Sequence, residues 1–227
     1  MWELVKAGGW LMAPIVVCSV LALAIILERS LRLRTQKVTP DGLANAVIAH
    51  LHHQPAEASW LAQLAAGSPL GDVLATGIRF AAGGLDYVQM QMQARANTHI
   101  HALEKHLNLL GTIGQIAPLL GLLGTVLGII EAFLAVNAGG VTDPALLAAG
   151  ISQALITTAA GMVVAVPALV AYRHYQRKVI DLAVNMEAQC SLLVQALIGP
   201  HAASGAVSEA YTAHDEFPVL QTGDHQP

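Results

Sequence analysis

Three long runs of the sequence contain no charged residue, and they dominate its hydrophobic pattern. They cover residues 7–27, 106–130 and 144–172. Each is longer than the roughly 20 residues that a helix needs to cross the hydrocarbon core of a bilayer. Runs of this length are not strands, and the backbone in lipid must be satisfied within the helix. The pattern therefore predicts an all-α integral membrane protein with three transmembrane helices, of which the third is long enough to tilt or extend beyond the membrane.

The first run also has the position of a signal peptide. Its length and the charged residues Glu28, Arg29 and Arg32 that follow it, without a small-residue cleavage site, favour a retained helix. We therefore predict this order: an N-terminal segment 1–9, transmembrane helices 10–28, 106–136 and 144–172, a helical insert 29–105, a short loop 137–143, a helical extension 173–199 and a disordered tail 200–227.

Turn-forming residues divide the insert into at least three helical pieces, and residues 29–37 can continue the first span. Breaks are expected at 38–42, at 67–69 and at 83–84. At the second break Ser68 is the expected N-cap and Pro69 the first helical residue. From Leu85 the pattern is helical and continues without a clear stop into the second span. The third span opens with Asp143 as N-cap, and residues 199–200 end its extension.

Lysine and arginine residues are distributed unevenly between the two ends of the spans. They are frequent in the segment 28–105 and after residue 172, whereas the loop 137–143 has none and the N-terminus has Lys6 alone. Basic residues mark cytoplasmic segments. We expect the N-terminus and the short loop to be periplasmic, and the insert and the C-terminus to be cytoplasmic. The residues concerned are Arg29, Arg32, Arg34, Lys37, Arg95, Lys105, Arg173, Arg177 and Lys178, which are also candidates for lipid headgroup contacts.

Composition supports the membrane prediction and excludes several functions. Charged residues are 11% of the chain and hydrophobic residues 55%, against roughly 25% charged residues in a soluble domain. The net charge of −4 and the low aromatic content do not fit nucleic-acid binding. Two cysteines give no disulfide framework, and the histidines are poorly spaced for a metal site on a helix. No nucleophile with a base, phosphate loop or metalloprotease motif is present, so we expect no enzyme, no cofactor and no metal.

Small residues form a stripe on each of the second and third spans. Helical spacing places them on one face of each helix, where they allow close approach of helices in lipid. The stripes are either packing faces of a helical bundle or, in part, the lining of a central space that holds another helix. The members are Gly114, Pro118, Gly121, Thr125 and Gly128 in the second span, and Gly150, Ala154, Thr158, Gly161, Ala165 and Ala168 in the third.

Polar residues within these spans favour a polar path. Thr125 and Thr158 lie on the two stripes and can face one another. Thr157 lies slightly off the stripe of the third span, and Gln153 lies one turn before it. A membrane threonine often only bonds to its own helix, so each is weak evidence by itself. No Asp, Glu, Lys or Arg lies in the middle of a span. If the protein conducts protons, another chain must supply the titratable group.

Two sequence blocks carry a family resemblance. Residues 117–128 read APLLGLLGTVLG and residues 150–161 read GISQALITTAAG. Together they resemble the signature of the MotA/TolQ/ExbB proton-channel family, and the topology of three spans is similar to the ExbB and TolQ branch. The position of Gln153 often holds a glutamate in that branch, and glutamine cannot titrate.

The resemblance implies a function and a set of partners. It implies a ring of five copies in the bacterial inner membrane, with the second and third spans around a dimer of a one-span protein like ExbD or TolR. An intramembrane aspartate of that partner carries the proton past Thr125 and Thr158. The work is passed to a TonB-like protein for outer-membrane transport or, as the alternative, to a TolA-like protein for envelope integrity and division.

Two other classes of function remain to be weighed. A passive assembly scaffold is one alternative. A solute carrier is less consistent with three spans that have no inverted repeat and no pair of broken helices.

Overall fold

The computed structural model describes residues 8–138 and 144–198, all of them in helices, turns or connecting segments. The N-terminal residues 1–7, Asp143 and the predicted tail 200–227 lie outside the described residues. The chain divides into two compact units, Met1–Arg34 with Ala102–Ile180, and Thr35–His101 with Asp181–Pro227. Each unit is described separately, and the long last helix contributes to both.

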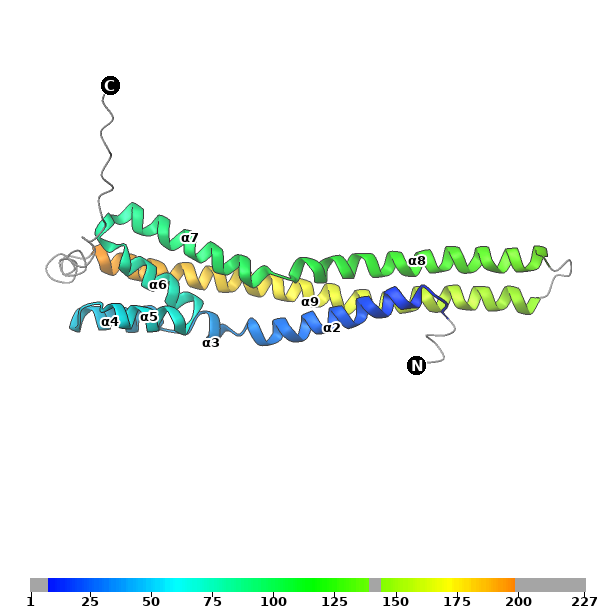
Figure 1. Ribbon diagram of the computed structural model, residues 1–227, viewed down its shortest axis with the longest axis horizontal. Coiled ribbons are helices and arrows are strands. Elements are labelled where there is room, and N and C mark those ends of the chain that lie inside the picture. Colours follow the sequence, from blue (N-terminus) through cyan, green and yellow to red (C-terminus); the bar gives the residue numbers. More distant parts are fainter. Residues whose placement is uncertain (1–7, 139–143, 199–227) are drawn as a thin grey trace, which may run out of the picture. The chain divides into compact units, whose positions relative to one another are not determined.

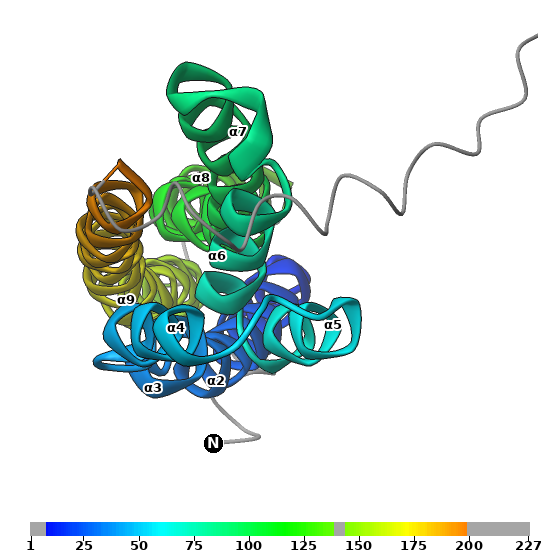
Figure 2. The ribbon, with the colours of Figure 1, turned by 90° about the vertical axis from the view of Figure 1, so that its left-hand side faces the viewer.

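The first unit contains three helices long and apolar enough to cross a membrane. They are α2 (Met12–Arg32), α8 (Leu107–Ala138) and the part of α9 (Pro144–Ile198) that ends at Ile180. In Figures 1 and 2 these three helices lie alongside one another. The Thr158 hydroxyl joins α9 to α8, and the Tyr175 hydroxyl donates a hydrogen bond of 3.0 Å to the Ile26 carbonyl of α2. The predicted all-α membrane fold is confirmed.

The helix boundaries correct the sequence prediction at two places. Helix α2 ends at Arg32, and the following residues form a separate short helix, α3 (Thr35–Val38), instead of continuing the first span. The insert also does not run unbroken into the second span. Helix α7 (Leu85–Glu104) stops before α8, and His106 between them has a left-handed φ of 66°. The periodic pattern of α7 and α8 gives no sign of this break, because His106 at the break contacts side chains of α2, which are distant in sequence.

The second unit contains the remaining helices of the insert and the end of α9. Its helices α4 (Leu43–His53), α5 (Ala58–Gly67) and α6 (Pro69–Arg79) are followed by the 3-10 turn η1 (Ala81–Gly83) and most of α7. The three predicted breaks are confirmed. Ser68 accepts a hydrogen bond of 3.0 Å from the Gly71 amide and Pro69 begins α6, as the capping pattern predicts.

Two polar clusters connect elements within the second unit. The Gln189 side chain of α9 accepts a hydrogen bond of 3.2 Å from the Ala44 amide and donates to the Pro40 carbonyl at 3.2 Å. It therefore satisfies an amide in the first turn of α4, which has no partner inside the helix. Asp72 of α6 accepts from Arg95 Nε at 2.6 Å and pairs with His99 Nε2 at 2.7 Å, both on α7.

Candidate functional site: the helix pair α8 and α9

Helices α8 and α9 approach so closely at their centre that only glycine fits. A Cβ atom on Gly161 would lie 2.6 Å from the Ala117 carbonyl oxygen, and one on Gly121 would lie 3.0 Å from Thr158 Cα. Both contacts are with backbone atoms, which cannot move aside. The two helices are therefore in backbone contact here, as small residues permit in membrane proteins.

Other small residues continue the same contact along both helices. Gly114 faces Leu169, Gly128 faces Ala154, and Gly150 faces Ala132, so the two helices are antiparallel. Ala154, Ala165 and Ala168 are buried, and Pro118 inside α8 is half-buried. The two stripes thus meet within one chain. The glycines of the two stripes therefore form a packing face between α8 and α9. That the neighbouring polar residues line a pore stays a prediction.

The hydroxyls of Thr158 and Thr125 both donate to backbone carbonyls. Thr158 Oγ1 donates across the helix pair to the Gly121 carbonyl at 2.9 Å, whereas Thr125 Oγ1 donates to Leu122 in its own helix at 2.6 Å. Both residues are partly exposed on the single chain. Since a hydroxyl has one hydrogen and two lone pairs, each threonine still offers acceptor capacity to another group.

Thr157 lies in the packed face of α9, and Gln153 lies beside the turn that precedes α2. Thr157 is 1% exposed and packs against Gly124, so it lies in the packed face and not slightly off it. Its hydroxyl donates to the Ala154 carbonyl at 2.8 Å. Gln153 is half-buried, and its amide lies against Gly9, whose φ of +72° also favours glycine. The turn before α2 therefore covers part of this region of α9.

The chemistry of this helix pair is that of neutral polar groups in an apolar setting. The spans supply hydroxyls, amides and carbonyls, and no Asp, Glu, Lys or Arg lies in residues 107–130 or 145–172. Within the described part of the chain, no three His, Cys, Asp or Glu residues come together as a metal site. The arrangement can accept hydrogen bonds from a protonated group.

Most of the apolar surface of the spans remains uncovered in one chain. In the most apolar 18-residue stretch of each span, only 28% of the residues are buried. Side chains such as Leu155 (63% exposed) and Leu122 (58% exposed) face outward. One face of α9 is largely exposed, along Ala148, Ile151, Ser152, Leu155, Ile156 and Ala159. These faces are available to lipid or to further chains.

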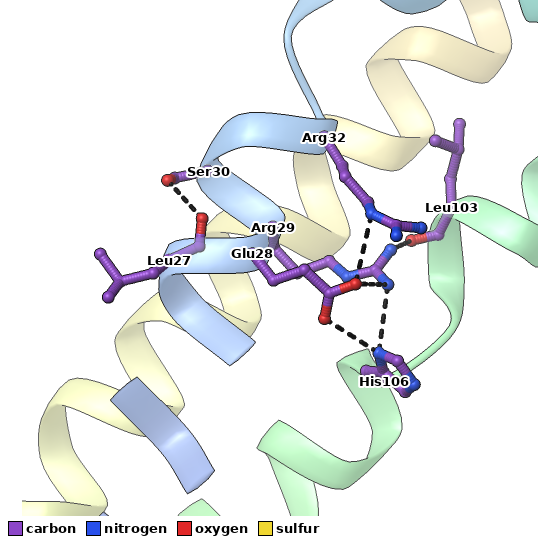
Figure 3. Close-up of polar contacts among 7 residues, drawn as sticks. All are labelled: Leu27, Glu28, Arg29, Ser30, Arg32, Leu103 and His106. Atoms are coloured by element: carbon purple, nitrogen blue, oxygen red, sulfur yellow. Dashed lines mark hydrogen bonds and ion pairs between the residues drawn. The ribbon is translucent and has the colours of Figure 1, made fainter. Parts of the chain in front are cut away.

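Sequence reasoning missed a second polar group, at the end of α2. Arg29, interpreted as a topology signal, is fully buried and contacts His106 and the Leu103 carbonyl (Figure 3). An arginine directly after an apolar run is ordinary in sequence. The left-handed His106, which is unusual for a residue other than glycine, is visible only in the structure.

A comparison with protein-family models decides the family. The model of the MotA/TolQ/ExbB proton channel family matches residues 65–188, which include all of α8 and most of α9. This chain belongs to that family. The predicted recognition, carried by residues 117–128 and 150–161, is therefore confirmed.

Relatives place the chain in the ExbB and TolQ branch of the MotA/TolQ/ExbB family. The biopolymer transport protein ExbB-like 1 of Synechocystis sp. is 34% identical over 73% of this chain and 66% of its own length. Biopolymer transport protein exbB1 of Vibrio cholerae is 54% identical over 30% of this chain and 31% of its own. The Tol-Pal system protein TolQ of Haemophilus influenzae is 38% identical over 39% of each. The matches thus span about two thirds of the first relative and under two fifths of the others.

Proposed function

We propose that this protein is the channel subunit of an inner-membrane stator driven by the proton-motive force. Five copies form a ring, and helices α8 and α9 surround a dimer of a one-span partner like ExbD or TolR. The single observation that carries the proposal is the family-specific helix pair, which presents hydroxyls but no mid-span charge. Family membership and the uncovered apolar faces of the spans support it.

The proposed orientation follows from the basic residues. Lysine and arginine flank α2 and α9 on one side, where Arg29, Arg32 and Arg173 follow apolar runs. By the positive-inside rule this side is cytoplasmic and the segment between α8 and α9 is periplasmic. The same basic residues are proposed to contact lipid headgroups at this membrane surface.

The threonines supply the proposed polar contact for the partner. Thr125 and Thr158 already donate to carbonyls, so they can only accept from a further group without breaking these bonds. A protonated aspartic acid donates, whereas an aspartate does not. The threonines would therefore stabilise the partner's intramembrane aspartate in its neutral form, which is the form that enters lipid at the lower cost.

The output of the motor is proposed to be ExbB-like, acting on a TonB-like protein for outer-membrane transport. Two of the three relatives described above bear ExbB names. A TolQ-like role on a TolA-like protein is the second candidate, because the TolQ of Haemophilus influenzae is 38% identical over 88 residues. Uptake assays and detergent sensitivity of a deletion strain distinguish the two.

Proton flux into liposomes tests the proposal. The protein alone should show no flux above that of empty liposomes, because no Asp, Glu, Lys or Arg lies in the middle of its spans. Flux should appear when the one-span partner is incorporated, and it should be lost when the partner's intramembrane aspartate is replaced by asparagine. Robust flux through this chain alone would contradict the proposal.

The oligomeric state is tested separately, in detergent. Native mass spectrometry should give a mass of several copies, with five expected. A preparation that contains only monomers, yet retains its helical spectrum, would contradict the ring.

A further inference from the structure

The end of α2 and the start of α8 are joined by a compact group of charged and titratable side chains (Figure 3). Arg29 donates through Nη1 to the Leu103 carbonyl at 2.9 Å, and its Nη2 lies 3.3 Å from His106 Nδ1. His106 Nδ1 also lies 3.1 Å from Glu28 Oε2. We name Glu28, Arg29 and His106 the junction cluster, since they hold the break that precedes α8.

The two contacts of His106 Nδ1 exclude one another chemically. A guanidinium can only donate and an ionised carboxylate can only accept. Nδ1 must therefore carry a lone pair to bind Arg29, or a hydrogen to bind Glu28. A neutral ring with its hydrogen on Nε2 makes the first contact, whereas a protonated ring, or a neutral ring with its hydrogen on Nδ1, makes the second. The geometry thus places one nitrogen between two states.

Burial differs sharply within the cluster. The Arg29 side chain is 1% exposed, and its Nε has no hydrogen-bond partner among the described residues. The Glu28 side chain is 32% exposed and that of His106 is 40% exposed. Water can deliver a proton to His106 directly. The consequence falls on Arg29, because a buried cation depends on its few partners.

Charges of both signs surround His106. From α2, Arg29 and Arg32 both approach the Glu28 carboxylate, with Arg32 Nε at 3.3 Å from Oε1. Glu104 and Lys105 precede His106 in the chain, and α9 contributes Tyr172 beside Gly111 and Tyr175 bonded to Ile26. A charged His106 becomes a third cation around Glu28 and stands directly beside Arg29.

We propose that the junction cluster is a proton-sensitive latch between α2 and the start of α8. The latch is closed when His106 is neutral and carries its hydrogen on Nε2, because only this form lets Arg29 hold both the imidazole and the Leu103 carbonyl. Protonation turns Nδ1 to Glu28, removes an acceptor from Arg29 and places a like charge 3.3 Å from it, so the hold on Leu103 loosens. Histidine changes charge between about pH 5 and pH 8, so the latch responds to the pH on its own side of the membrane.

The latch is independent of the proposed channel, since it rests on contacts within this chain alone. Amide hydrogen exchange of residues 102–111 tests it, on the full-length oligomer in detergent and with labelling times scaled for the intrinsic rate at each pH. Exchange should rise by about tenfold as the pH falls through the range in which histidine charges. A flat profile in the wild-type protein would overturn the proposal.

Variants separate the latch from general acid effects. His106→Asn keeps an acceptor for Arg29 and tolerates the left-handed backbone, so it should remove the pH step and keep exchange slow. Glu28→Gln keeps the shape but removes the ionised acceptor of the protonated ring, so the difference in exchange between high and low pH should become smaller. The control His52→Asn, at an exposed histidine of α4, should keep the wild-type profile.

A second variant guards against misfolding. His106→Gly relieves the positive φ and removes the ring, so it should fold, lack the pH step and exchange fast at every pH. If either His106 variant kept the step, the responding group would be elsewhere and the latch would be excluded.

Discussion

The hydroxyl of Thr158 on α9 donates a hydrogen bond of 2.9 Å to the backbone carbonyl of Gly121 on α8, 37 residues away in sequence. This bond sits where the two helix backbones touch. It connects the packing of the pair to the residue for which we propose a contact with the partner's aspartate. Substitutions at Thr158 therefore need to separate packing from function.

Thr158→Val should assemble but lose most of the proton-driven output. Hydrogen bonds between membrane helices contribute about 0.6 kcal/mol on average, which is too little to disrupt a three-helix unit. Loss of an acceptor for a desolvated carboxyl should cost about 1–3 kcal/mol, or roughly tenfold or more in rate. Energised uptake and co-purification with the partner are the measurements.

Matched variants complete this test. Thr158→Ser retains the hydroxyl and should keep most of the output. Thr157→Val should leave output closer to wild type, since Thr157 is buried and bonds to its own helix. A fully active Thr158→Val, or one that fails to assemble, would assign the residue to packing.

Gly161→Ala should disrupt the pairing of α8 and α9. The added Cβ would meet the Ala117 carbonyl at 2.6 Å, and neither backbone can shift without separating the helices. Overpacking of this kind costs about 1–3 kcal/mol. Thermal denaturation in detergent should show a lower midpoint, whereas Gly67→Ala, with nothing within 4 Å of the new atom, should not. Equal midpoints would contradict the close approach.

Asp72→Asn should destabilise the second unit in a manner that depends on pH. Burial by itself raises the pKa of Asp72, but hydrogen bonds from Arg95 and His99 outweigh it and hold the pKa below its ordinary value. The stability that the ionised Asp72 contributes to the folded state is therefore present above about pH 4. It is lost as the pH falls through the lowered pKa. We expect Asp72→Asn to lower the free energy of unfolding by about 1 kcal/mol at neutral pH. The effect is small because Arg95 is half exposed and solvent screens the pair.

Denaturation of both proteins across the pH range measures this difference. It should vanish in acid, and Asp41→Asn at an exposed position should show little effect at any pH. A difference for Asp72→Asn that persists in acid strong enough to protonate the carboxyl in the folded protein would indicate a role other than the charged hydrogen bonds.

Gln189→Leu should loosen the start of α4. The substitution leaves the buried Ala44 amide without an acceptor and the Pro40 carbonyl without a donor. An unsatisfied buried group costs about 1–3 kcal/mol. Hydrogen exchange of residues 43–47 should accelerate, while Gln195→Leu, at an exposed site of α9, should leave it unchanged. Exchange that stays at the wild-type rate in Gln189→Leu would exclude this role.

The sequence by itself determined the features that neighbouring residues encode. Three apolar runs predicted three long helices, and the Ser68–Pro69 pair predicted the start of α6 through the local rules of capping. The two blocks 117–128 and 150–161 pointed to the MotA/TolQ/ExbB family before any contact was known. Each of these signals lies within a window of a few turns.

Only the tertiary structure decided which faces meet and which charges are buried. It paired the glycines of α8 with α9, placed Thr157 in the contact, and buried Arg29 against a histidine 77 residues away. The break at His106 belongs to the same class, since the groups that hold it are on α2. A repeat of small residues every 3.6 positions predicts that a helix has a small-residue face. The energy of close packing also depends on the surface of the partner helix, which the sequence pattern of one helix does not contain.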